Sequence, residues 1–318
     1  MSYELRAGEA LGDGVRRICR RQISLALEAN KSARTAANSP VHRTRKHLKK
    51  ARAALRFLAP VVTAREFARA HNGLRKAARL LSDIRDAEVR FQTMQQLGQL
   101  LHIEKDDVLE QAEAFLGLEL ESFLAGFSDW KKEVDRLLSA ARSQSKEWPV
   151  ESLTCKQLRR SAQTAYRRGR RALRLAQRQP TSENFHTVRK RAKELMYQLR
   201  ILQPLHPALF HQLVSELQVL TENLGNAHDL AFLEQRLIKR SRKGKDDPAA
   251  KALSELIGLR EKELQRTAAA LGERFYAEKP KAFARRVSEF FDGWETQPDG
   301  HVAAVKQIAR SRVQLNGH

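Results

Sequence analysis

Hydrophobic residues recur along most of the chain at intervals of three and four positions, the spacing that gathers them on one side of an α-helix. Leu, Ala, Arg, Glu, Gln and Lys dominate, and the alternation of β-branched residues that marks strands is absent. The nine prolines lie mostly at the edges of the apolar segments, where helices begin or end. The sequence therefore predicts an all-α protein.

The predicted helices form two sets. The first set covers residues 13–34, 40–59, 63–101 with a break near Ser82, and 104–142. The second set covers residues 153–178, 182–203, 207–223, 227–242, 248–277 and 280–293. The polar segment between the sets, 143–149, ends in a proline. It predicts a boundary between two helical domains, 10–142 and 150–295, followed by a basic tail or helix at 296–318.

Two of these helices repeat one pattern 144 positions apart, VHRTRKHLKKARAALRFL at 41–58 and FHTVRKRAKELMYQLRIL at 185–202. In each copy five basic side chains fall within an arc of about 100°, opposite a largely apolar side. These positions are His42, Arg45, Lys46, Lys49 and Arg56 in the first copy, and His186, Arg189, Lys190, Lys193 and Arg200 in the second. Ser39-Pro40 and Thr181-Ser182 supply N-cap residues just before the two helices.

Carboxylates are missing around these stripes. No Asp or Glu occurs between Glu28 and Glu66, where there are ten Lys or Arg residues, or between Glu151 and Glu183, where there are nine. A solvated helix face usually mixes the two signs, because like charges at helical spacing repel. The plain alternative is a solvated surface, but the uncompensated repulsion favours an anionic ligand.

Composition supports the same interpretation. The chain has 59 Lys plus Arg against 37 Asp plus Glu, a formal charge of +22, which favours association with a polyanion such as nucleic acid or an anionic surface. Cys19 and Cys155 have no metal-ligand spacing and are expected to be reduced thiols. The N-terminal residues lack the apolar core of a signal peptide, and the apolar runs are too short for a membrane span. We expect a cytoplasmic protein without membrane insertion.

The repeat extends beyond the stripes. LSDIRDAEV at 81–89 matches LGNAHDLAF at 224–232, which aligns Asp86 with Asp229 and Arg85 with His228. We expect both aspartates to orient basic side chains. The helices that precede the stripes add a second set of basic residues, namely Arg17 and Arg21 in the first half, and Arg160, Arg167, Arg171 and Arg174 in the second. The stripes also differ, because Lys50 aligns with Glu194 and Arg52 with Met196, so the first copy is the more uniformly cationic.

This duplicated constellation resembles the CHAD domain, the conserved histidine α-helical domain, over roughly residues 10–295. The resemblance implies two pseudo-symmetric halves, each like a four-helix bundle, that face each other across a basic groove or pore. It also implies binding of inorganic polyphosphate and residence on polyphosphate granules. The candidate polyphosphate-binding residues are His42, Arg45, Lys46, Lys49, Arg52, Arg56, His186, Arg189, Lys190, Lys193, Arg200, Arg17, Arg21, Arg160, Arg167, Arg171 and Arg174.

A phosphate chain suits these residue types, because arginine forks bind two oxygens at once and lysine supplies a mobile point charge. If His42 and His186 contact the ligand, binding should tighten as the pH falls from about 8 to about 6. The alternative is that each is a neutral, hydrogen-bonded residue at a helix start.

Two other function classes use similar chemistry. A nucleic-acid-binding protein would use the same basic faces. Single-strand binding also favours aromatic side chains on which bases stack, but aromatic residues make up only 6% of the chain and do not lie among the basic residues of the stripes. A phosphate-transfer enzyme would need clustered carboxylates for metal ions or a Gly-rich phosphate loop, and the stripes contain neither. We therefore expect a non-catalytic binding protein with no metal site and no cofactor, with nucleic acid as the alternative ligand.

Overall fold

The computed structural model describes residues 3–32, 39–101, 107–241 and 248–296, and these ranges contain helices and no strand. The α-helices are α1 (Leu11–Lys31), α2 (Pro40–Leu58), α3 (Ala64–Leu80), α4 (Ser82–Leu101), α5 (Asp107–Ala125), α6 (Phe127–Gln144), α7 (Cys155–Arg178), α8 (Ser182–Ile201), α9 (Pro207–Ser241), α10 (Pro248–Phe275) and α11 (Pro280–Thr296), with a short 3₁₀ helix, η1 (Gln203–Leu205). The all-α prediction is confirmed.

The predicted break near Ser82 is confirmed by the junction of α3 and α4, but two other boundaries were wrong. The single helix expected at 104–142 is divided at Gly126 into α5 and α6. The break expected between 223 and 227 does not occur, because α9 continues through it. Leu224 and Ala227 are both buried, so the helical apolar spacing persists across this segment.

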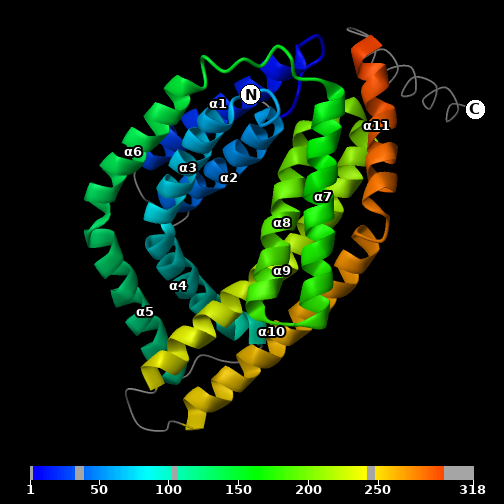
Figure 1. Cartoon of the computed structure of the whole chain (residues 1–318). Coiled ribbons are helices and arrows are strands. Elements are labelled where there is room, and N and C mark those ends of the chain that lie inside the picture. The colour runs from blue at the N-terminus through cyan, green and yellow to red at the C-terminus, as the bar shows by residue number, and fades with distance from the viewer. Residues whose placement is uncertain (1–2, 33–38, 102–106, 242–247, 297–318) are drawn as a thin grey trace, which may run out of the picture.

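The helices pack so that the two striped helices meet (Figure 1). Helix α2 packs along α1, α8 packs along α7 and α9, and α2 and α8 contact each other. At the lower end of Figure 1, α4 and α5 approach α9 and α10. The contact between α2 and α8 therefore places the two cationic stripes at the centre of the molecule.

Both hydrophobic clusters contain residues from both sets of helices. The larger cluster includes Leu55 of α2 and Leu195 of α8, each fully buried. The smaller cluster joins Leu97 of α4 to Leu233 of α9 and Ile257 of α10. The two halves thus share apolar packing, which fixes α2 against α8. The division into two domains and their pseudo-symmetry stay predictions, and the tail from 297 lies outside the described residues.

The N-caps predicted for the striped helices are confirmed. The side chain of Ser39 accepts a hydrogen bond from the His42 backbone N–H (3.0 Å), and Thr181 accepts one from that of Asn184 (3.2 Å). The Ser39 hydroxyl also donates to the carboxylate of Glu88 on α4 (2.7 Å). The start of α2 is therefore fixed both by its own cap and by α4.

The segment between α6 and α7 packs against α1. Trp148 is buried, and its carbonyl accepts a hydrogen bond from Arg16 Nη1 (3.1 Å). Gly12 of α1 lies so close that an added Cβ would be 1.9 Å from the carbonyl oxygen of Val150. Cys19 and Cys155 are both buried, and no disulfide joins them. In the described part of the chain, no helix combines the length and apolar character needed to cross a bilayer.

We predict that Gly12→Ala lowers the free energy of unfolding by about 2 kcal/mol or more, because α1 must move away from the Val150 carbonyl. Gly73→Ala, in α3, is the matched control, since nothing lies within 4 Å of its added Cβ. The control should stabilise the protein by about 0.5–1 kcal/mol through helix propensity. Urea denaturation of both variants measures the difference, and equal effects would show that the segment at 145–154 does not pack on α1 as described.

Candidate functional site

Basic side chains of four helices converge where α2 meets α8. We name this group the central cluster, and its members are His42, Arg45, Lys46 and Lys49 of α2, Arg85 of α4, His186, Arg189, Lys190 and Lys193 of α8, and His228 of α9. Burial by the surrounding helices and the nearby charges of Arg189 and Arg45 lower the pKa of Lys49 to about 7. Burial, Arg189 and Arg200 lower the pKa of Lys193 to about 8, against the opposite effect of Glu222.

The arginines of the cluster are held in place by backbone contacts. Arg45 Nη1 donates to the carbonyl of Ala78 at the end of α3 (2.6 Å). The guanidinium of Arg189 lies against α9 at Gly225, where an added Cβ would be 2.9 Å from Nη2. Gly225 therefore permits the close approach of Arg189 to α9. Among the described residues, Arg189 Nε and His186 Nδ1 are buried atoms without a hydrogen-bond partner.

The histidines of the cluster are neutral at pH 7. The rings of His186 and His228 stack with their centroids 4.1 Å apart. Burial and neighbouring cations lower the pKa of His42 and of His228 to about 4, and that of His186 to about 3. These pKa values belong to the ligand-free protein, so the expected tightening of binding between pH 8 and pH 6 stays a prediction. In the ligand-free protein, the lysines with pKa values in that range include Lys49 and Lys193 of the cluster and Lys50 beside it.

The two aspartates of the repeated segments lie beside the cluster arginines. Burial raises the pKa of Asp86, and the positive charge of Arg45 opposes this effect. Burial likewise raises the pKa of Asp229, opposed first by Arg189. This placement fits the orienting role expected from the sequence, because each carboxylate draws one arginine toward the cluster.

Comparison with known proteins identifies the family. The model of the CHAD domain matches residues 17–238. The chain belongs to the CHAD domain family. The crystal structure of the CHAD domain from the plant Ricinus communis superposes with a TM-score of 0.58 and 15% sequence identity, and covers 88% of this chain and 94% of the plant chain. At that identity the likeness shows the fold alone. No curated protein sequence matches this CHAD protein.

The CHAD protein does not bring all the predicted residues into the central cluster. At the far end of the α2 stripe, Arg56 Nε pairs with Glu194 of α8 (3.0 Å), and Arg52 lies close to this pair. Arg17 binds Glu9 through two nitrogens (2.5 and 2.6 Å), and Arg21 pairs with Glu28 (2.8 Å). Arg17, Arg21 and Arg56 already have carboxylate partners. Their role in ligand binding stays a prediction.

The basic stripe of α7 lies apart from the cluster. Arg160, Arg167, Arg171 and Arg174 are all exposed. The main causes of the pKa shifts of the cluster lysines and histidines lie elsewhere, on α2, α4, α8 and α9. A different arginine of α7, Arg168, approaches Glu194 of α8, with its Nη1 at 3.9 Å. The four exposed arginines of α7 therefore provide a control, in binding experiments, for the charged residues of the cluster.

Sequence reasoning missed two members of the cluster in this CHAD protein. Arg85 lowers the pKa values of His42 and Lys49, and His228 stacks on His186. The signal was present, because the repeat aligns Arg85 with His228, directly before the paired aspartates. Equivalent positions in the two copies of the repeat therefore contribute to the same site.

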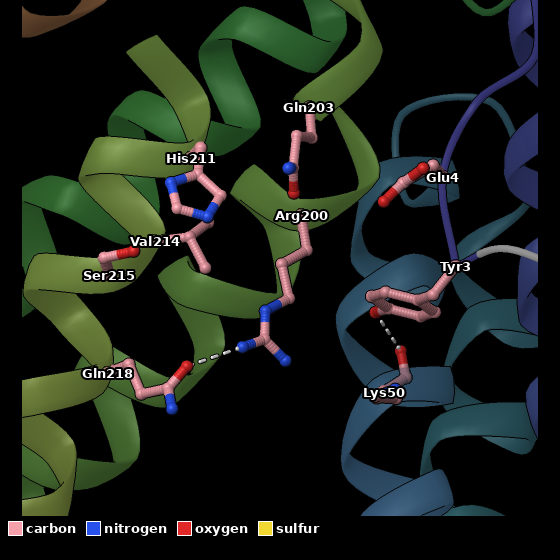
Figure 2. Close-up of a pocket in the computed structure, with 9 residues that line it drawn as sticks. All are labelled: Tyr3, Glu4, Lys50, Arg200, Gln203, His211, Val214, Ser215 and Gln218. Atoms are coloured by element: carbon pink, nitrogen blue, oxygen red, sulfur yellow. Dashed lines mark hydrogen bonds between the residues drawn. The ribbon is translucent and has the colours of Figure 1, made fainter. Parts of the chain in front are cut away.

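A side cavity of about 340 Å³ adjoins the cluster (Figure 2). Lys50 of α2 and Arg200 of α8 lie on opposite sides of it. Arg200 was predicted as a ligand-binding residue, and it faces this cavity. Lys50, which in the sequence stands out only as a difference between the repeats, also lines this cavity. Burial, Lys46 and Arg200 lower the pKa of Lys50 to about 8.

We predict that Lys49→Met stabilises the ligand-free protein at pH 7 by about 1 kcal/mol, since it removes a repelled charge that solvent partly screens. The pKa of Lys49 is about 7 in the folded protein, below its ordinary value of 10.5. The unfolded chain therefore binds more protons between these values, and unfolding free energy should rise with pH from about 7 to about 9. In Lys49→Met this rise should be smaller.

Denaturation at low ionic strength and several pH values measures this effect. Lys132→Met is the control, because Lys132 is exposed on α6, away from the cluster. A Lys49→Met variant that is less stable than the wild type at pH 7 would contradict the repulsion described for the cluster.

Proposed function

We propose that this CHAD protein binds inorganic polyphosphate through the central cluster, without catalysing its turnover. The observation that carries the proposal is the meeting of the α2 and α8 stripes, where Lys49 and Lys193 lie among arginines and their pKa values fall toward neutrality. A polyanion would relieve that repulsion. The family is associated in general with polyphosphate-related proteins, which supports the same ligand.

A phosphate chain fits the cluster better than an isolated anion does. The charged cluster residues come from α2, α4 and α8, and Lys46 and Lys193 lie between the rest of the cluster and Arg200. Repeated charge along a track suits a ligand with evenly spaced anionic oxygens and no base edges. Each contact releases condensed counterions, so the affinity should fall steeply with salt, as it does for nucleic acids.

Nucleic acid is the alternative ligand, and the aromatic environment argues against it. Phe232 is the aromatic residue whose ring lies near His228, with centroids 6.0 Å apart. The guanidinium of Arg90 covers the ring of Phe232 at 5.0 Å from its centroid. A ring already covered by an arginine offers little stacking surface to a base.

The absence of turnover is part of the proposal. The carboxylates nearest the cluster, Asp86 and Asp229, lie beside arginines. A carboxylate that orients an arginine is not free to hold a metal ion for phosphoryl transfer. We further propose a cytoplasmic location on polyphosphate granules, where long chains are concentrated.

Replacement of four cluster residues by Gln tests the binding site. Arg45, Lys49, Arg189 and Lys193 changed together should weaken binding of labelled long-chain polyphosphate by about 100-fold or more, because several charge-assisted contacts are lost. The matched control changes the four exposed arginines of α7 to Gln, which removes the same charge. The control should lose less than about 5-fold, which is the loss expected from the long-range field alone.

Fluorescence anisotropy at fixed salt measures both variants, with DNA and RNA as competitors of the wild-type complex. Equal losses in the two variants would show that only diffuse charge matters. If DNA displaces the labelled polyphosphate as effectively per unit charge as unlabelled polyphosphate does, the result would favour the nucleic-acid alternative. Phosphate release from polyphosphate with Mg²⁺ or Mn²⁺ present would contradict the non-catalytic part of the proposal.

A further inference from the structure

The side cavity in Figure 2 is lined by two basic residues, Lys50 and Arg200. Arg200 donates from Nη2 to Gln218 Oε1 (3.0 Å), and the rest of its guanidinium points into the gap toward Tyr3 and Lys50. The ammonium of Lys50 lies 4.8 Å from the ring centroid of Tyr3, whose hydroxyl donates to the Lys50 carbonyl (2.9 Å). Tyr3 therefore positions Lys50 opposite Arg200.

The repeat explains why these cations are left without an ion pair across the helix contact. The offset of 144 residues aligns Lys50 with Glu194 and Arg200 with Arg56. On one side of the contact between α2 and α8, Arg56 pairs with Glu194 at 3.0 Å. On the reciprocal side, Arg200 meets Lys50, so a lysine stands where the other copy has a carboxylate. One side of the contact between α2 and α8 therefore has an ion pair, and the equivalent position on the other side has a cavity lined by two cations.

The cavity has the lining and the size of an oxyanion site. Its polar walls include Gln203, Ser215 and His211, which offer hydrogen bonds around the two cations. Glu4 also lines it and offsets part of the positive charge. The volume of about 340 Å³ is near the lower limit of small-molecule sites, so it suits a few phosphate units and not a folded chain.

Electrostatic interactions link the cavity to the central cluster. Lys46 acts on the pKa of Lys50 and of Lys193, and Arg200 acts on the pKa of both. These four residues form a cationic path from the cluster to the cavity. A phosphate chain that lies along the stripes can therefore reach the cavity with its end.

We infer that this cavity binds a terminal phosphate group, either the end of a phosphate chain lying in the central cluster or the end of a free short oligophosphate. This inference rests on the proposed function and adds a chain-end specificity to it. A terminal phosphate carries a second ionisation that internal units lack, so it matches a pocket with two facing cations. The internal phosphate units, each with one charge, then bind at the central cluster.

Binding of tripolyphosphate by calorimetry tests the inference. Lys50→Gln with Arg200→Gln should weaken this binding about 10-fold or more, the loss of two charge-assisted contacts. Lys50→Glu should do the same, because it restores the carboxylate that Glu194 provides in the other copy. The matched control is Lys132→Gln with Arg266→Gln, two exposed residues of α6 and α10 that should leave the affinity unchanged. Thermal melts establish that each variant folds.

Long-chain polyphosphate with both ends blocked as amides identifies the source of the terminal group. If the chain end enters the cavity, blocking weakens wild-type binding and has no further effect in the cavity variants. If blocking has no effect, the cavity belongs to free oligophosphates. Retention of tripolyphosphate affinity in both cavity variants would overturn the inference. Failure of the wild type to bind unblocked long chains would instead overturn the proposed function, so the two failures are distinguishable.

Discussion

Repulsion between the basic faces of α2 and α8, held together by apolar packing, is the constraint on which the rest of the structure depends. The cationic side chains of α2 face those of α8, while Leu48 and Leu55 on one helix and Leu195 and Leu199 on the other are fully buried. Each buried leucine contributes about 1.5–3 kcal/mol to folding, whereas each repulsion acts on side chains that solvent partly screens. Packing therefore outweighs repulsion, and the ligand-free protein keeps an uncompensated cationic site.

Contacts at the edges of the site keep this arrangement in register. The Ser39 cap ties α2 to Glu88 of α4, and the Ser182 hydroxyl donates to Glu261 of α10 (2.5 Å) at the start of α8. Gly225 allows Arg189 to approach α9. Each striped helix is thus fixed at its N-terminus by a carboxylate of a neighbouring helix. The site is preorganised, so a ligand need not order these helices when it binds.

The sequence predicted the site helices closely, because their caps and apolar spacing are local signals. The helices expected at 40–59 and 182–203 are α2 (Pro40–Leu58) and α8 (Ser182–Ile201). The partners of individual cations depend on how the helices cross, which no local pattern encodes. Arg56 lies on the same stripe as Lys49, yet it meets Glu194, and Arg17 meets Glu9 from the N-terminal segment. The cavity between Lys50 and Arg200 has the same origin in the crossing of α2 and α8.

The most direct test of the central claim is the number of protons taken up when polyphosphate binds. Calorimetric titration near pH 8.5, in two buffers with different ionisation enthalpies, measures that number. Because the pKa values of Lys49 and Lys193 are about 7 and about 8 in the free protein, the phosphate chain should raise them and draw protons onto both lysines. The expected result is net proton uptake that decreases in Lys49→Met. Binding without proton uptake would contradict the claim, since the lysines would then be fully charged before the ligand arrives.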